Sequence, residues 1–323
     1  MIKHVKTLAA CLSALLLAGC AASPTPAPTT TRYHVAMIAK STSTEFWSAV
    51  FAGAEAAATE YNMDLTITGS ESEEDYSSQN DLIEKAVEEG AQAIIFSASD
   101  YQKNAAAIDA AADKGVRIVV VDSAVNSSKV SAYVGADNYG AGQMAAKSAL
   151  KNVEGPLHVG LVNYNVNSPN AQEREEGVID TLTASGRAEV AATVYSVATP
   201  ESARAEALTM LARHPEINVL ISFNEAVSVG AAQAVSDLNR ADDLWMVAFD
   251  SNITTVDALH TGAVDAMVVQ NTYGMGYFSV ENAYKLLAGQ GSDVTRETET
   301  ATRIIDRSNI FALDGQKAVF PFE

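Results

Sequence analysis

Apolar and polar residues follow one another along this chain in a regular rhythm of short strands and longer helices. Residues 35–39 form an apolar run of the kind that predicts a buried strand. A polar turn follows, in which Ser43 or Thr44 is placed to cap a helix over residues 45–61. Because the apolar residues of that helix recur at helical spacing, one of its faces is suited to packing on a sheet.

The same strand and helix pattern repeats through the rest of the chain. Strands separated by helices of this length favour βαβ units and a parallel sheet. We expect strands at residues 35–39, 64–68, 93–97, 117–121, 130–134, 157–162, 189–195, 218–222, 244–248 and 264–269. We expect helices at residues 45–61, 76–89, 102–114, 138–151, 171–184, 202–213, 226–238, 253–260 and 273–287, and an extended tail at 300–311.

So many strands predict two α/β lobes rather than one sheet. Each lobe is expected to be Rossmann-like, with a mostly parallel sheet flanked by helices, and a multi-strand hinge is expected to join them. The first lobe is expected to span residues 33–137 and to be completed by about 271–298. The second is expected to span residues 138–270 and to be completed by about 299–323. A (β/α)₈ barrel is the alternative, but the extended tail is not typical of a barrel's closing unit.

The first residues have the features of an export signal. A positively charged start precedes an apolar stretch at residues 8–18 that is too short to span a membrane. Residues 17–20, Leu-Ala-Gly-Cys, resemble the lipobox of bacterial lipoproteins, in which the cysteine becomes the acylated first residue. Residues 21–32 form a Pro/Thr-rich linker. We therefore expect a signal peptide at 1–20 and lipidation at Cys20, with an ordinary signal peptide as the alternative.

Charge and cysteine content exclude several classes of function. Removal of residues 1–20 leaves 19 basic and 40 acidic residues, a formal charge of −21, which repels nucleic acid. Cys11 lies in the discarded segment, so the mature protein would keep no cysteine except the lipidated Cys20, and neither a disulfide nor a thiolate metal site is possible within the domain. The histidines are scattered and no Gly-rich phosphate loop occurs. We therefore expect no cofactor, no metal and no enzymatic activity.

Polar side chains follow nearly every predicted strand, where the turns of a parallel sheet emerge on one edge. Singly, such residues are most simply helix caps or Asx turns. Together, carboxylates, amides, an arginine and aromatic rings suit a polyol, whose hydroxyls pair with planar polar groups and whose C–H faces stack on rings. The acidic run at residues 71–75 is interpreted as a solvated loop.

Short motifs in one order along the chain resemble the type I periplasmic sugar-binding proteins, the ribose-binding-protein family related to lactose-repressor effector domains. The motifs are Ser43-Thr44-Glu45-Phe46-Trp47, Val119-Val120-Val121-Asp122-Ser123, Val134-Gly135-Ala136-Asp137-Asn138, the segment 168–177, Ser222-Phe223-Asn224-Glu225, Val247-Ala248-Phe249-Asp250 and Val268-Val269-Gln270. The resemblance covers about residues 33 to 310 and implies the periplasmic-binding-protein-like fold. Thr44, Ser123 and Glu225 depart from the family pattern, so the identity of the sugar stays open.

The resemblance implies a set of ligand contacts and a role in transport. The implied contacts are Thr44, Phe46, Trp47, Ser97, Asp122, Ser123, Arg174, Asn224, Asp250 and Gln270. Phe46 and Trp47 are expected to clamp the sugar ring, and Trp47, on a partly polar face of the helix, is the better binding candidate of the two. Arg174 is expected to donate a fork of hydrogen bonds. The expected protein is the monomeric, lipid-anchored binding component of an ABC-type sugar importer. It would meet a permease and its ATPase on the outer face of the cell membrane, which is in the periplasm where an outer membrane exists.

Three other functions remain as alternatives at this point. A loaded binder could present its ligand to a membrane receptor or sensor kinase, which the sequence does not distinguish from transport. A glycosidase built on Asp122 and Asp250 is conceivable from the two carboxylates alone. A transcriptional regulator shares the domain, but an export signal stands where a helix-turn-helix would be, and the chain is strongly acidic.

Overall fold

The computed structural model describes residues 32–320, so the predicted signal peptide, linker and Cys20 lie outside the described residues, apart from Arg32. Residues 33–320 belong to one compact unit. Two six-stranded sheets lie within the described part of it, with the strand orders β11-β5-β4-β3-β1-β2 and β12-β10-β9-β8-β6-β7. The prediction of two α/β lobes is therefore confirmed, and the barrel alternative is wrong.

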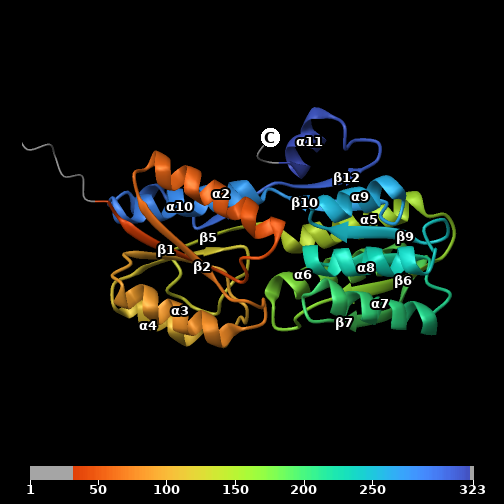
Figure 1. The fold of residues 1–323 in the computed structure, drawn as a ribbon, viewed down its shortest axis with the longest axis horizontal. Coiled ribbons are helices and arrows are strands. Elements are labelled where there is room, and N and C mark those ends of the chain that lie inside the picture. The colour runs from red at the N-terminus through yellow and green to blue at the C-terminus, as the bar shows by residue number, and fades with distance from the viewer. Residues whose placement is uncertain (1–31, 321–323) are drawn as a thin grey trace, which may run out of the picture. The chain divides into compact units, whose positions relative to one another are not determined.

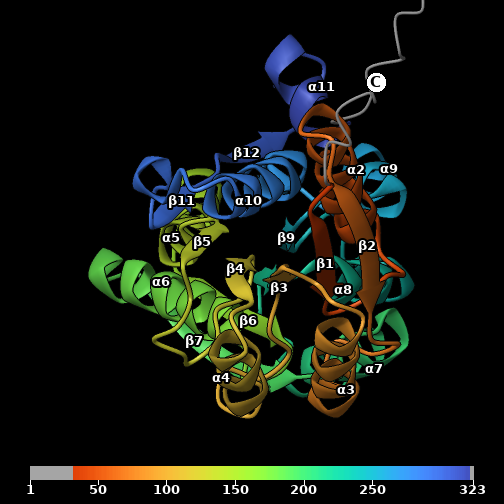
Figure 2. The same cartoon turned by 90° about the vertical axis from the view of Figure 1, so that its left-hand side faces the viewer.

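The first lobe is a parallel sheet with helices on both faces. Its strands are β1 (His34–Ala39), β2 (Asp64–Gly69), β3 (Ala93–Phe96), β4 (Arg117–Val121), β5 (Ala132–Gly135) and β11 (Glu297–Glu299). Its helices are α2 (Glu45–Glu60), α3 (Tyr76–Glu88), α4 (Ala105–Asp113) and α10 (Thr272–Leu287). Figure 2 shows α2 and α10 on one face of this sheet and α3 and α4 on the other. One apolar core lies on each face for this reason.

The second lobe repeats this arrangement around one larger core. Its strands are β6 (Leu157–Asn163), β7 (Ala188–Tyr195), β8 (Val219–Ser222), β9 (Trp245–Phe249), β10 (Ala266–Gln270) and β12 (Thr302–Asp306), of which β12 runs antiparallel to β10. Its helices are α5 (Asn138–Asn152), α6 (Pro169–Ser185), α7 (Pro200–Arg213), α8 (Glu225–Asp237) and α9 (Ile253–Thr261). A short turn η1 (Gly291–Asp293) precedes β11, and α11 (Leu313–Val319) follows β12.

The chain passes between the lobes three times, as can be followed in Figure 1. It crosses between β5 and α5, between β10 and α10, and between β11 and β12. Helix α10 follows a strand of the second sheet but packs beside α2 of the first lobe. These short crossings are the structural equivalent of the predicted multi-strand hinge.

Differences from the predicted elements have local causes. Helix α4 begins three residues later than predicted, because Asp100 accepts hydrogen bonds from the amides of Gln102 and Lys103 and holds this segment in a turn. The predicted extended tail contains β12 but then turns into the unpredicted helix α11. Among the described residues, no helix is long and apolar enough to cross a membrane.

Candidate functional site

Each sheet has the strand order of a doubly wound α/β fold, in which ligands bind at the carboxyl ends of the strands. A small cavity of about 20 Å³ lies at this edge and takes its walls from both lobes. Its lining residues are Lys40, Thr44, Phe46, Trp47, Glu73, Asp122, Tyr164, Asn170, Arg174, Asn224, Glu225, Ala226, Asp250 and Gln270. Such a volume holds one or two water molecules. We call this space the central cavity.

Asp122 and Asp250 occupy equivalent places in the two lobes. Each follows the fourth strand of its sheet, and each has a left-handed backbone, with φ of 61° and 64°. Their amides donate to Val134 and Val268 on the neighbouring strand, both at 2.9 Å. A non-glycine residue held in this region stores strain that is typical of functional sites. The turn directs both carboxylates to the central cavity.

The two aspartates have different partners. Asp122 accepts hydrogen bonds from Asn170 of the other lobe at 2.7 Å and from Ser97 at 3.1 Å. Asp250 accepts one from Gln270 at 2.6 Å. Burial raises the pKa of Asp250 to about 7, although Arg174 and the Gln270 hydrogen bond act in the opposite direction. Of the two aspartates, Asp250 therefore has fewer side-chain donors for its charge.

Arg174 is fixed by four contacts. Its Nε donates to Asn138 at 2.9 Å, its Nη1 to the carbonyl oxygen of Phe223 at 2.7 Å, and its Nη2 to Gln270 at 3.1 Å, while its guanidinium lies 4.9 Å from the centre of the Phe249 ring. Helix α6 can bring it so close because α5 and α6 touch at glycine. A Cβ on Gly142 would lie 2.1 Å from the carbonyl oxygen of Arg174 itself. The guanidinium, 2% exposed, is thus preorganised by contacts within the protein.

The aromatic pair of α2 differs in burial from the expectation. Trp47 is 1% exposed and belongs to the first lobe's core, stacking on Phe51 at 6.0 Å, whereas Phe46 is half-buried. The two rings meet edge to face at 5.2 Å because adjacent helical residues diverge by about 100°. Trp47 also donates from Nε1 to Glu73 at 3.3 Å. Both rings line the central cavity, but Trp47 does so from the core.

Eight of the ten residues predicted for the site line the central cavity: Thr44, Phe46, Trp47, Asp122, Arg174, Asn224, Asp250 and Gln270. The other two lie behind Asp122. Ser97 donates to its carboxylate at 3.1 Å, and the amide of Ser123 donates to Ser97 Oγ at 3.3 Å. The lining therefore contains side chains from both lobes that the family resemblance had implied.

Sequence reasoning missed Lys40, Glu73 and Asn170. Lys40, 3% exposed, lies 3.5 Å from Ser168 Oγ and 5.5 Å from the centre of the Tyr164 ring. Burial works to lower the pKa of Lys40, but Tyr164, Glu73 and Asp122 outweigh it, so the pKa is raised. Lys40 directly follows β1. The rule that residues after parallel strands gather at one edge of the sheet could therefore have identified it. Asn170 lies within the motif at residues 168–177 but was not predicted as a ligand contact.

The acidic run at residues 71–75 is exposed at Glu71 and Ser72, but the interpretation of the whole run as a solvated loop is wrong for Glu73 and Glu74. Glu73 lines the central cavity, and burial raises the pKa of its carboxyl group. Glu74 accepts a hydrogen bond across the lobes from the amide of Ala198 at 2.8 Å. The loop carries these side chains because it follows β2, next to β1 at the cavity edge.

A further acidic contact joins the lobes at the start of α2. Glu225 of the second lobe accepts hydrogen bonds from the amides of Glu45 at 3.2 Å and Phe46 at 2.7 Å, and from Asn252 at 2.9 Å. Glu45 in turn accepts from the amide of Ile253 at 3.4 Å. A carboxylate at a helix N-terminus is favoured by the helix dipole. Closure of the lobes therefore satisfies free amides at both helix starts.

Within residues 32–320, no group of three or more His, Cys, Asp and Glu side chains could hold a metal ion. Asp122 and Asp250 accept hydrogen bonds from the side-chain amides of Asn170 and Gln270. Arg174 donates to the amide oxygen of Gln270. This arrangement recognises polar groups.

Comparisons with known proteins agree with this geometry. The D-ribose/D-allose-binding protein of Pseudomonas aeruginosa is 31% identical over 121 residues, a match that spans 38% of this chain and 38% of that relative. GanP, a glucose-galactose binding protein from Geobacillus stearothermophilus, matches with a TM-score of 0.80 at 26% identity, covering 86% of this chain and 99% of that chain.

A carbohydrate transporter solute binding protein from Agrobacterium radiobacter, in complex with D-arabinose, shares the fold with a TM-score of 0.86 at 23% identity, covering 90% of this chain and 100% of that chain. These relatives are binding proteins, in agreement with the prediction that the chain is not an enzyme. A family model described as "Periplasmic binding protein domain" matches residues 35–291. This chain therefore belongs to the periplasmic binding protein domain family, as the sequence motifs indicated.

Proposed function

We propose that this protein binds a monosaccharide or a similar polyol in the central cavity. The observation that supports this most directly is the convergence of carboxylates, amides, one guanidinium and aromatic rings from both lobes around one space. Planar carboxylate and guanidinium groups pair with adjacent hydroxyls, and rings cover the C–H face of a sugar. The relatives named above are carbohydrate binders by description, which favours the same ligand class here.

Binding requires the lobes to separate and close again. The central cavity of about 20 Å³ is too small for any sugar, so a ligand enters only when Glu225 and Asn170 release their partners across the lobes. The three crossings between the sheets are short and suited to a hinge. The ligand then stabilises the closed form through contacts that exist only in that form.

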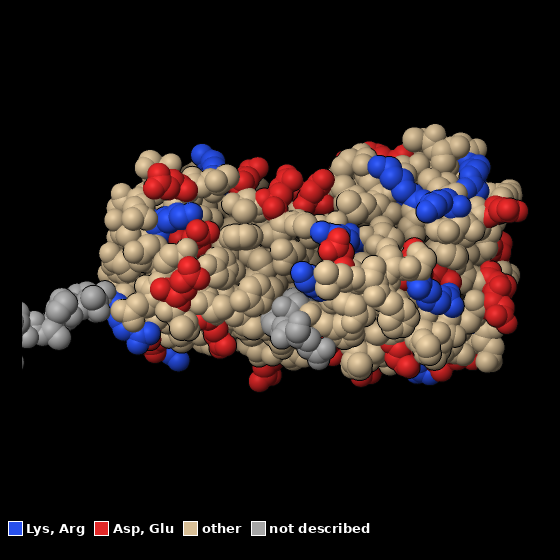
Figure 3. All heavy atoms as spheres, turned by 90° about the horizontal axis from the view of Figure 1, so that it is seen from above, with Lys and Arg blue, Asp and Glu red and all other residues tan. Residues whose placement is uncertain are grey.

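The biological role that fits this binding is delivery of the sugar to an ABC-type permease and its ATPase. We propose that the chain is exported and held by lipid at Cys20 on the outer face of the membrane, as a monomer, with residues 21–32 as tether. A nucleic acid partner is not favoured: on the face shown in Figure 3, basic side chains are interspersed with acidic ones and form no continuous basic surface.

A thermal-shift screen against pentoses, hexoses, polyols and nucleosides tests the ligand class, with calorimetry for each hit. A specific ligand at 100 to 1,000 times its Kd stabilises the native state by roughly 3 to 4 kcal/mol. Arg174→Lys keeps the charge but loses the planar fork and should abolish the shift. The matched control is Arg204→Lys, an exposed arginine on α7 that pairs with Asp237. Stabilisation by amino acids alone, or an equal response of both variants, would refute the proposal.

A further inference from the structure

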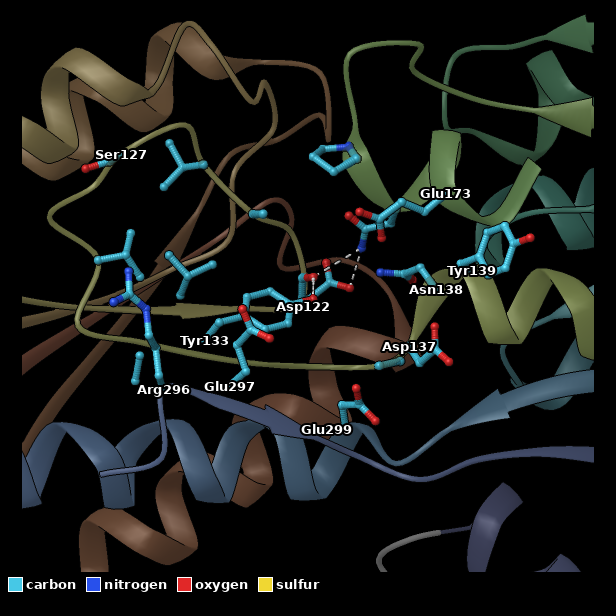
Figure 4. Close-up of a pocket in the computed structure, with 18 residues that line it drawn as sticks. Asp122, Ser127, Tyr133, Asp137, Asn138, Tyr139, Glu173, Arg296, Glu297 and Glu299 are labelled. Atoms are coloured by element: carbon cyan, nitrogen blue, oxygen red, sulfur yellow. Dashed lines mark hydrogen bonds between the residues drawn. The ribbon is translucent and has the colours of Figure 1, made fainter. Parts of the chain in front are cut away.

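A second and larger cavity lies beside the crossings between the lobes, with a volume of about 490 Å³. It is shown in Figure 4, and we call it the hinge cavity. Its lining residues are Val120, Asp122, Ala124, Val125, Ser127, Val130, Ala132, Tyr133, Ala136, Asp137, Asn138, Tyr139, Pro169, Asn170, Glu173, Arg296, Glu297 and Glu299. Pockets of about 300 to 1,000 Å³ commonly bind small molecules. The hinge cavity is therefore large enough for a ligand of its own.

The lining of the hinge cavity combines charged and apolar side chains. Five carboxylates face one arginine, and Figure 4 shows the acidic side chains on the side of the cavity away from Ser127. Among residues 32–320, none of these six charged groups takes part in an ion pair within 4.0 Å. The valines and alanines of the segment 120–132, which also carries Asp122 and Ser127, add an apolar part to the lining. The cavity thus combines an excess of four negative charges with a hydrocarbon surface.

One residue that lines the hinge cavity, Asn170, has an unused hydrogen-bond acceptor. Asn170 is 2% exposed, and its Nδ2 donates to Asp122 at 2.7 Å. Its Oδ1 has no hydrogen-bond partner within the described part of the chain. A buried carbonyl oxygen left without a donor costs free energy, so a donor supplied by a ligand would be favourable there. The carboxylates, like this oxygen, are acceptors only.

A single metal ion does not suit this set of groups, because no three of the acidic side chains in the described residues are close enough to share one. An extended molecule that carries several positive charges suits these groups better. We propose that the hinge cavity binds a linear polyamine, whose ammonium groups donate to the separated carboxylates and to Asn170 while its methylene chain lies on the valines and alanines of the lining. Several ammonium groups along one chain match charges that are spread over the lining.

Occupation of the hinge cavity would act on the central cavity through a shared wall. Asp122 and Asn170 line both cavities, and their 2.7 Å hydrogen bond joins the lobes. A ligand that binds one arrangement of the lobes better than the other shifts their equilibrium, and the coupling is reciprocal. Polyamine and sugar binding are therefore linked, but polyamine binding itself is measured without sugar and does not depend on the proposed function.

Calorimetric titration of the mature chain with spermidine at low salt tests the inference. We expect saturable binding that weakens at least about tenfold when Glu173→Gln and Glu297→Gln are combined, since two ammonium–carboxylate pairings are then lost in a partly enclosed site. The matched control combines Glu84→Gln with Glu88→Gln, two exposed residues of α3. It removes the same charge far from the cavity and should change the affinity less than about twofold.

Two results would overturn the proposal. Magnesium chloride at equal charge could produce the same heat as spermidine, which would show only general attraction to an acidic protein. The cavity and control variants could also lose affinity equally. Far-ultraviolet circular dichroism checks that the double variant is folded. If it is not, Glu297→Gln alone is used, because Glu297 is exposed on the edge strand β11 and its change leaves the core intact.

Discussion

The raised pKa of Asp250 makes closure of the lobes dependent on pH, and Asp250→Asn removes that dependence. The side chain is 5% exposed, and burial raises its pKa to about 7 from a usual value of 3.8. Arg174 and the hydrogen bond from Gln270 lower this pKa in part, and Glu225 and Asp122 raise it further. Asparagine is nearly isosteric, its Oδ1 still accepts from Gln270, and it tolerates the left-handed backbone at φ 64°.

The size of the effect follows from the two pKa values. When the lobes separate, water reaches the carboxyl group and its pKa returns toward the usual value. A difference of about 3 pKa units corresponds to about 4 kcal/mol of free energy. At pH 8 Asp250 is ionised in both forms, and the closed form is less stable by this amount than it would be with a neutral side chain. Because the closed form has the higher pKa, closing takes up a proton between about pH 4 and 7. Closure without sugar is therefore favoured as the pH falls and opposed as it rises.

Small-angle X-ray scattering of the sugar-free protein measures this equilibrium through the radius of gyration. At pH 8, Asp250→Asn should shift the ratio of closed to open molecules by up to about 1,000-fold toward closure. The difference should shrink to below about 1 kcal/mol near pH 4. Asp257→Asn on α9, an exposed acid, is the control and should behave as the unmodified protein. Equal radii for the unmodified protein and Asp250→Asn throughout this range would refute the reasoning.

Three further changes test other parts of the structure. Trp47→Ala should lower the free energy of unfolding by about 3 to 5 kcal/mol, measured in urea, because the ring is 1% exposed; a loss below about 1 kcal/mol would contradict its role in the core. Glu225→Gln should weaken the sugar-free closed form by about 1 kcal/mol in scattering, because the charge at the start of α2 is lost, whereas Glu201→Gln, an exposed acid in the first turn of α7, should leave it unchanged. Cys20→Ala should move the protein from the membrane to the soluble fraction of fractionated cells, and retention at the membrane would contradict lipid anchoring there.

Much of the fold could be predicted because its determinants are local. Apolar runs such as residues 117–121 and capping residues such as Thr44 act within a few positions of themselves. The strand-end rule also identifies Asp122 and Asp250 from sequence alone, since carboxyl ends of parallel strands share one edge. These local patterns do not predict which lobe a helix packs on. Helix α10, for example, follows a strand of the second sheet but packs on the first lobe.

The residues that prediction missed depend on distant partners. Glu73 stands in a run of acids that is typical of a solvated loop, and only the packing of β2 beside β1 carries it to Trp47 and the cavity. Asn170 has no local signal, since its partner Asp122 is 48 residues away. Trp47 was expected on a partly polar face of its helix. It is buried instead, because it stacks on Phe51 and packs into the core beneath α2. Contacts across the lobes are set by tertiary packing, which periodicity does not encode.

Each lobe places a carboxylate at the central cavity by the same backbone turn, but the two carboxylates have different surroundings. Asp122 and Asp250 share a place in the strand order, a left-handed backbone and a hydrogen bond to the adjoining strand. Asp122 has two side-chain donors, one of them from the opposite lobe, so its charge is compensated in the closed form. Asp250 has one donor and a raised pKa, so it gains most from a ligand hydroxyl. A sugar hydroxyl that donates to Asp250 would stabilise its ionised carboxylate in the closed form, so closure around the sugar would not need to take up a proton. The affinity for the sugar should therefore fall less with rising pH than the stability of the sugar-free closed form does.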